Sequence, residues 1–298
     1  MAASAGARAA GVVFAAAAAF GFSFKAIFVK AAYLHGVDAE TLLALRMGYA
    51  LPFFMLMAIA AGGTSALRRR DWAELLLLGV LGYYLSSYLD FLGLRYISAA
   101  LERIILFIYP TLVVLLSALL LHKPLSGERA ALLLACYLGV ALSVAPALRA
   151  AGAHTLLGGV LVFASALSYA VYLMLSGETV ARLGSMRVTA YATGGACILC
   201  VAQFVLLRPL SALQQPWQVQ VLALCMAVFS TVVPIWLVTE AIRRLGAGTA
   251  SMIGSLGPII TIGLASALLG ERLGWAQVVG ALIVVVAVTW LSRSRAVI

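Results

Sequence analysis

Long apolar runs follow one another through almost the whole chain and decide what it can fold into. Each run has about 20 residues, which as a helix is the length that crosses the hydrocarbon core of a bilayer. Strands of a membrane barrel would instead alternate apolar and polar residues over about ten positions. We therefore expect an all-α integral membrane protein with ten transmembrane helices, in the ranges 10–33, 40–61, 73–94, 99–121, 129–147, 155–176, 188–207, 217–239, 248–269 and 275–292.

The composition agrees with helices that are solvated by lipid. Hydrophobic residues make up 64% of the sequence and charged residues 10%, whereas a soluble domain is about half apolar and about a quarter charged. The first 24 residues also resemble a secretory signal, with small residues that a signal peptidase would accept. Their apolar stretch is long and has a counterpart in the second half of the chain, so we interpret it as the first transmembrane helix.

The chain has a net charge of +10, and its basic residues are unevenly distributed between the loops on the two sides of the membrane. When the N-terminus is placed inside, twelve lysines and arginines fall in inside loops and five in outside loops, the latter being Arg95, Arg103, Arg149, Arg208 and Arg272. This bias follows the positive-inside rule. We therefore expect a multi-pass protein of the bacterial inner (plasma) membrane, with N- and C-termini cytoplasmic, basic loops that contact membrane lipid, and no nucleic-acid partner.

The two halves of the chain repeat each other at a constant shift of 148 residues. Pro110 then matches Pro258, and the matching stretches around them are YPTLVVLLSALLLHKPL and GPIITIGLASALLGERL. We therefore expect two five-helix repeats, residues 1–148 and 149–298. Because five is odd, the second repeat enters the membrane from the opposite side. This is the inverted architecture of secondary transporters, in which a central cavity opens to each side in turn.

These features resemble the EamA family of the drug/metabolite transporter (DMT) superfamily over the whole chain. The resemblance rests on the ten spans, on the two five-helix halves, and on the two matching stretches around Pro110 and Pro258 in the fourth and ninth spans. The tag GERL is typical of the family, and the first copy departs from it as HKPL. The aromatic stretch YYLSSYLDF is most similar to the YddG type of aromatic amino acid exporter. The resemblance implies a central substrate cavity and export rather than import.

Charged residues inside membrane spans are costly, so each is a candidate for function. The spans contain the cations Lys25, Lys30 and Arg46, and we expect Asp90 to be the single deep acid. Lys25 and Asp90 fall at a similar depth, so they could form a structural ion pair between the first and third helices. Alternatively, one of them meets a carboxylate or ammonium of the substrate or takes a coupling proton. Lys30 and Arg46 lie nearer the outer interface, where we expect them to snorkel.

Tyrosines and small hydroxyl residues recur on single faces of the spans. Tyr83, Ser87 and Asp90 follow the spacing i, i+4, i+7, and Tyr169 and Tyr172 share a face of the sixth span. Such faces could line a substrate cavity, or they could serve ordinary helix packing. The candidate substrate-binding residues are Lys25, Tyr83, Ser87, Tyr88, Asp90, Tyr109, Tyr169, Tyr172, Trp236, Ser251 and Ser255.

Pro110 and Pro258 occupy equivalent positions in the middle of the fourth and ninth spans. Each proline removes one backbone hydrogen bond, so we expect the helix to bend there. The bend could act as a hinge in alternating access, or it could be a static kink.

The expected function is export of small metabolites by alternating access, with aromatic or other large neutral amino acids as cargo. Flat organic cations are an alternative cargo, because aromatic faces attract cations. A nucleotide-sugar-like cargo would favour several deep arginines or lysines, and only Lys25 is expected at that depth. A membrane enzyme or receptor is less expected. We predict a small-molecule substrate, no catalytic residue, no metal, no cofactor and a monomeric chain.

Overall fold

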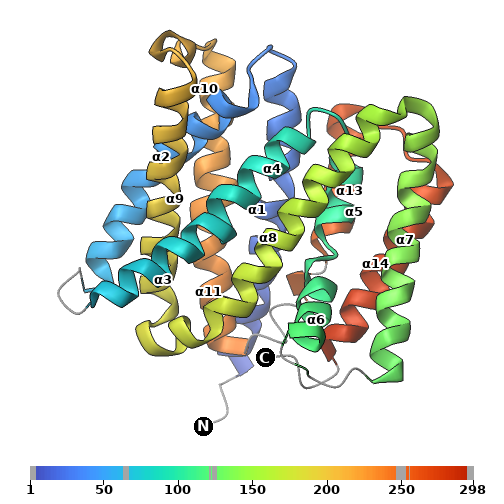
Figure 1. Cartoon of the computed structure of the whole chain (residues 1–298), viewed down its shortest axis with the longest axis horizontal. Helices are drawn as coiled ribbons and strands as arrows, with labels where there is room; N and C mark the ends of the chain where they lie inside the picture. Colours follow the sequence, from blue (N-terminus) through green and yellow to red (C-terminus); the bar gives the residue numbers. More distant parts are fainter. Residues whose placement is uncertain are drawn as a thin grey trace.

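The computed structural model describes residues 5–62, 67–120, 122, 126–245, 253–254 and 256–293 (Figure 1). Within these ranges the chain forms helices, turns and short loops and no β-strand. The segments η1 and η3 are π-helical, and η2 is a 3-10 turn. In chain order the helices are α1 (Ala5–Tyr33), α2 (Ala39–Ala60), α3 (Arg69–Gly79), η1 (Val80–Leu85), α4 (Ser86–Gly93), α5 (Ala99–Leu106), α6 (Tyr109–Leu120), α7 (Gly127–Ala151), α8 (Ala153–Leu183), α9 (Ser185–Leu207), η2 (Leu210–Leu213), α10 (Trp217–Ala227), η3 (Val228–Val232), α11 (Val233–Leu245), α13 (Gly257–Leu269) and α14 (Trp275–Arg293).

The predicted spans are present as helices. Among the described residues, eight helical stretches are long and apolar enough to cross a membrane, and two shorter apolar helices follow them. The eight correspond in order to the first eight predicted spans, and α13 and α14 correspond to the ninth and tenth. The prediction of an all-α, ten-helix membrane fold is therefore confirmed.

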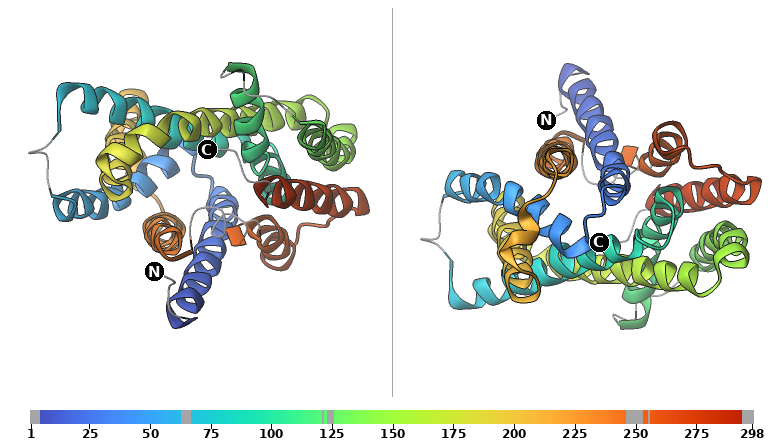
Figure 2. Two further views of the ribbon diagram at one scale, coloured as in Figure 1. Left: turned by 90° about the horizontal axis from the view of Figure 1, so that it is seen from below. Right: turned by 90° about the horizontal axis from the view of Figure 1, so that it is seen from above.

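The helices pack in the pattern that an inverted repeat requires. The second spans of the two halves, α2 and α9, pack against each other, as do the fifth spans, α7 and α14. The first span, α1, packs against α11 and α13 of the second half, and its counterpart α8 packs against α4 and α6 of the first half. Figure 2 shows the α7–α14 pair at one end of the long axis of the bundle and the α2–α9 pair toward the other. Exchange of the halves therefore maps each contact onto another contact, as a two-fold axis would.

The backbone repeats as well. Gly36 and Gly184, which match under the shift of 148, both have positive φ, 79° and 85°, where the chain leaves the first and sixth helices. Such a conformation suits a residue without a Cβ atom. The π-helices η1 and η3 also fall at matching positions, Val80 on Val228. Two interruptions that sequence composition alone would not reveal therefore occur once in each half.

The ends of the helices agree with the topology expected from the basic loops. In Figure 1, α1 begins, α14 ends, α3 begins and α11 ends at the lower end of the bundle. All four of these ends were assigned to the same side of the membrane. That this side is cytoplasmic stays a prediction.

Candidate substrate and ion site

Three charged side chains meet where α1, α4 and α5 approach one another. Lys25 Nζ lies 2.6 Å from Asp90 Oδ2 and 3.3 Å from Glu102 Oε1. The Lys25 side chain is 16% exposed, whereas those of Asp90 and Glu102 are 3% and 0% exposed. The ion pair between the first and third spans is therefore present as one of the two predicted alternatives. Its low exposure makes it a costly feature that packing alone does not require.

The expectation that Asp90 is the single deep acid is wrong. Glu102 is fully buried in α5. Ser98 starts that helix by accepting from the N–H of Leu101 at 3.1 Å, so Glu102 belongs to its first turn. The available signal was its position inside the predicted fourth span, 99–121. The run of apolar residues on either side masked it.

Arg103 was assigned to an outside loop, and this assignment is also wrong. The residue belongs to α5 and is partly buried, with a buried Nε atom that has no hydrogen-bond partner among the described residues. A Cβ atom added at Gly257 would lie 2.8 Å from Arg103 Nη2. The guanidinium therefore extends from the first half to the start of α13 in the second half.

Arg46 does not snorkel to an interface as expected. Its side chain is buried, its Nε donates to Thr231 Oγ1 at 3.1 Å, and its guanidinium lies 5.4 Å from the centre of the Phe91 ring. Two cations beyond Lys25 therefore lie in the interior, which the sequence-based depth estimate missed. Lys30 is partly buried, and its electrostatic partner is Glu271.

Four of the predicted tyrosines form a continuous row across the two halves. The ring of Tyr109 on α6 lies 5.1 Å from that of Tyr169 on α8, which lies 5.5 Å from Tyr172. Tyr172 continues to Tyr83 on η1, with ring centres 5.3 Å apart and hydroxyl oxygens 3.1 Å apart. We call these four residues the tyrosine row. Tyr169 and Tyr172, which were predicted to share a face of the sixth span, are thus extended at either end by rings from α6 and η1.

The π-helix η1 is held by serines of α8. Ser168 Oγ donates to the carbonyl of Leu81 at 2.7 Å, and Ser165 Oγ donates to the carbonyl of Ser86 at 2.7 Å. A π-helical turn disturbs the regular hydrogen-bond ladder, and such turns are frequent at functional sites. These two hydroxyls therefore serve contacts between helices, as small polar residues in membranes often do.

The remaining candidates lie apart from the tyrosine row or outside the described residues. Ser87 is partly buried on α4. Tyr88 stacks on Tyr84, with ring centres 6.4 Å apart. Trp236 on α11 is 54% exposed beside Phe14, with ring centres 6.1 Å apart. Two further candidates lie outside the described residues, namely Ser251 and Ser255.

The predicted bends take the form of interrupted helices. α5 ends at Leu106 and α6 begins at Tyr109, so Pro110 is the second residue of a new helix. Pro258 is likewise the second residue of α13. A proline in the first turn forgoes an N–H that has no intrahelical partner anyway. The chain therefore accommodates each proline by restarting the helix, and its role as a hinge stays a prediction.

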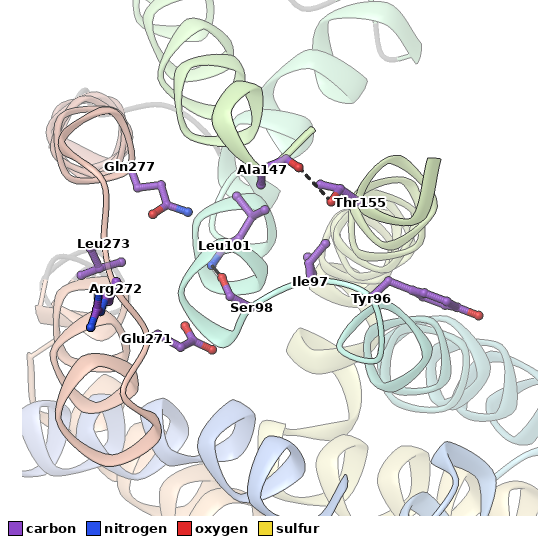
Figure 3. Close-up of a pocket in the computed structure, with 10 residues that line it drawn as sticks. All are labelled: Tyr96, Ile97, Ser98, Leu101, Ala147, Thr155, Glu271, Arg272, Leu273 and Gln277. Atoms are coloured by element: carbon purple, nitrogen blue, oxygen red, sulfur yellow. Dashed lines mark hydrogen bonds between the residues drawn. The ribbon is translucent and has the colours of Figure 1, made fainter. Parts of the chain in front are cut away.

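A pocket of about 290 Å³ opens at the end of the bundle opposite the start of α1 (Figure 3). None of the candidate substrate-binding residues lines it. On its wall, the Glu271 carboxylate accepts from the N–H groups of Ala99 and Ala100 at 2.8 and 3.1 Å. The acid of the GERL tag therefore caps the N-terminus of α5, where the helix dipole favours a negative charge. The central cavity expected from the resemblance stays a prediction.

Comparison with known proteins decides the family. Residues 9–145 and 156–293 each match the model of the EamA-like transporter family. The chain belongs to this family. This EamA-like transporter is 32% identical over 282 residues to the "uncharacterized transporter YcbK" of Bacillus subtilis (strain 168), covering 91% of this chain and 89% of that one. It is 24% identical over 247 residues to the "uncharacterized transporter YyaM" of the same organism, with 82% and 81% covered.

The fold also matches a solved structure. A crystal structure aligns with the EamA-like transporter at a TM-score of 0.66 and 18% identity, over 96% of this chain and 97% of that one. At this identity the match supports the fold alone. The duplicated family match and the helix packing together show a multi-pass membrane transporter built from two repeats. The boundary placed at residue 148 stays a prediction.

Proposed function

We propose that this EamA-like transporter exports aromatic or other large neutral amino acids by alternating access. The tyrosine row carries the proposal, because it joins α6 and η1 of the first half to α8 of the second. A ligand that packs on these rings would contact both halves at once. Flat apolar side chains suit such a surface, since aromatic pairs add about 0.5–1.5 kcal/mol beyond the area that they bury.

Arg103 supplies the polar part of substrate recognition. Its charge acts on the hydroxyls of both Tyr109 and Tyr169, so the guanidinium is within electrostatic range of the tyrosine row. Its buried Nε has no hydrogen-bond partner among the described residues. A guanidinium with a free donor is suited to a carboxylate. An amino acid with a large side chain offers a carboxylate to Arg103 and an apolar group to the rings.

A competition experiment in proteoliposomes tests this cargo. Uptake of labelled tryptophan is measured against unlabelled phenylalanine, leucine, tetraphenylphosphonium and a uridine diphosphate sugar. The proposal expects competition by the two amino acids and not by the other compounds. Competition by tetraphenylphosphonium alone would favour a flat organic cation as cargo. If tryptophan neither enters nor leaves the liposomes down its concentration gradient, the proposal is rejected.

A matched pair of tyrosine variants tests the site. Tyr169→Ala removes the ring that contacts both Tyr109 and Tyr172, and tryptophan transport should fall by about two- to tenfold, the value of one aromatic contact. Tyr49→Ala is the control, because Tyr49 lies on α2 and donates to Gln220 Oε1 at 2.7 Å, away from the row. Equal losses in the two variants would remove the tyrosine row from substrate binding.

The direction of transport is tested in cells. Expression of the protein should raise the concentration of aromatic amino acids in the medium after the cells are loaded with a dipeptide that releases them. A rise in uptake with no change in efflux would show import. That outcome would keep the cargo and change the direction.

A further inference from the structure

The cluster at Lys25 contains more hydrogen-bond acceptors than donors. Asp90 Oδ1 and both carboxylate oxygens of Glu102 are buried and lack a hydrogen-bond partner among the described residues. The two carboxyl groups flank one ammonium, with Lys25 Nζ 2.6 Å from Asp90 Oδ2 and 3.3 Å from Glu102 Oε1, and they act on each other by charge and hydrogen bonding. When both are ionised they can only accept, so neither satisfies the other. A buried acceptor left unpaired is costly, and a buried charge left unpaired is more so.

None of the described neighbouring groups donates a hydrogen bond to these three oxygens. The charges that act on Glu102 are Asp90, Lys25 and Arg103. The ammonium of Lys25 lies 2.6 Å from Asp90 Oδ2 and 3.3 Å from Glu102 Oε1. The guanidinium of Arg103 extends toward Gly257, and its Nε has no hydrogen-bond partner among the described residues. One ammonium therefore stands between two carboxyl groups.

Among the described residues, the other elements around the cluster bring one further acid, Glu271, which caps α5 at Ala99 and Ala100, and one further buried cation, Arg46. From α2, Arg46 acts on Asp90; its Nε donates to Thr231, and its buried Nη1 has no hydrogen-bond partner among the described residues. From α1, the hydroxyl of Tyr33 donates to the carbonyl of Phe91 at 2.7 Å. α8 contributes Tyr169, and α7 contributes Cys136 and Tyr137 beside apolar side chains. α14 packs on α5 with apolar side chains, and the described part of α13 has no titratable residue.

We propose that Asp90 and Glu102 together bind one exchangeable proton, and that this proton is the coupling ion of the transporter. The proton makes one carboxyl a donor to the other, which satisfies oxygens that are otherwise unpaired. No covalent bond other than the O–H bond forms or breaks. The proton enters from water on one side of the membrane and returns to water on the other.

Lys25 links the proton to the change of access. It lies on α1, which packs against α11 and α13 of the second half, whereas Asp90 and Glu102 lie on α4 and α5 of the first. A movement of α1 with the second half would change the distance of 2.6 Å between the ammonium and Asp90. Retreat of the ammonium favours the protonated pair, and its approach favours release of the proton.

Infrared spectroscopy of the purified, substrate-free protein tests the site without any assumption about cargo. A protonated carboxyl has a C=O stretch that an ionised one lacks, and exposed carboxyls, with a pKa of about 4, are ionised at neutral pH. We expect wild type to show this band at neutral pH and to lose it as the pH is raised. Glu102→Gln should lose the band, and Asp90→Asn should lose or shift it.

Glu178→Gln is the matched control, because Glu178 is exposed on α8. It should keep the wild-type band. Monodisperse elution in size-exclusion chromatography establishes that each variant is folded, and Asp90→Asn replaces Glu102→Gln if the latter fails this criterion. Absence of the band in wild type, or a band that persists in both Glu102→Gln and Asp90→Asn, would overturn the proton site.

A pH gradient across proteoliposomes tests coupling, and this second measurement rests on the proposed function. Tryptophan flux in wild type should increase several-fold when the gradient drives protons against the amino acid, and Glu102→Gln should lose this stimulation. Flux that ignores the gradient in wild type would overturn coupling. If tryptophan does not move at all, the proposed cargo fails while the infrared result still decides whether the carboxyl pair holds a proton.

Discussion

The two halves of the transporter have similar backbone structures but different buried charged residues. Both carry a π-helix at the same place in their third span, and both restart a helix one residue before a proline in their fourth. The charged residues Lys25, Asp90 and Glu102 of the first half match Leu173, Val238 and Ala250 of the second. Repetition therefore preserves the interruptions of the helices, while these three buried charges occur in the first half alone.

This difference has a physical reason. Alternating access needs two arrangements of similar energy, and equivalent backbones in opposite orientation provide them. In the proposed coupling, both arrangements share one ion site, and a second buried charge cluster would add desolvation cost. The comparison of the halves therefore separates backbone features that both halves share from charged residues that only the first half carries.

The largest expected effect comes from the ammonium at the centre of the cluster. Lys25→Met leaves two buried carboxyl groups without their cation and should lower the free energy of unfolding by about 3–5 kcal/mol. The matched variant Leu173→Met keeps volume and polarity and should cost less than about 1.5 kcal/mol. Denaturant unfolding in detergent micelles measures both. Equal losses would show that the charge cluster does not distinguish the halves.

A smaller effect is expected where the third spans differ in side-chain size. Gly79 is matched by Ala227 in the second half, and a Cβ atom at Gly79 would lie 2.4 Å from the carbonyl oxygen of Ala192. Gly79→Ala should therefore cost about 1–3 kcal/mol by overpacking α3 against α9. Gly195→Ala is the control on α9, since nothing lies within 4 Å of its Cβ position. A stable Gly79→Ala protein would show that α3 and α9 can separate freely.

The capping acid gives a still smaller effect. Glu271 caps α5, whereas the matching residue of the first copy is Lys123. Glu271→Gln should lower stability by about 1 kcal/mol, because it removes a charge from a helix N-terminus. Glu178→Gln, an exposed acid on α8, should leave the unfolding midpoint unchanged. A Glu271→Gln midpoint equal to wild type would mean that the two backbone donors find water instead.

The smallest effect is expected at an exposed ring. Trp236 matches Tyr88 under the repeat and is 54% exposed, so Trp236→Ala should change tryptophan flux by less than about twofold. Tyr88 is partly buried and stacks on Tyr84, so Tyr88→Ala should reduce flux more. Initial rates in proteoliposomes compare the two. A larger loss for Trp236→Ala would place the substrate path beside α11.

The sequence predicted what hydropathy and periodicity control. Apolar length located every span, the shift of 148 residues located the repeat, and the equal depth of Lys25 and Asp90 anticipated their contact at 2.6 Å. Prediction from the sequence failed at Glu102 and Arg103, because a span is recognised by its mean hydropathy, and two charged residues near its start barely change that mean. It also failed at Arg46, since depth along a helix does not say which way a side chain points.

Tertiary structure decided the rest. The tyrosine row needs rings from α6, α8 and η1, and no single-helix stripe contains them all. Ser168 and Ser165 of α8 bond to carbonyls within η1 and at the start of α4, which lie 87 and 79 residues away in the chain. Such features arise when helices meet, so a pattern along one helix cannot specify them.

The bond between Glu271 and α5 has a mechanical meaning. One carboxylate from the loop after α13 holds two adjacent N–H groups of the opposite half, at the end of the bundle away from the start of α1. Charge-assisted bonds of this kind are roughly twice as strong as neutral ones. Parting the halves at this end must break both hydrogen bonds together, so separation here costs more than the loss of a single neutral contact.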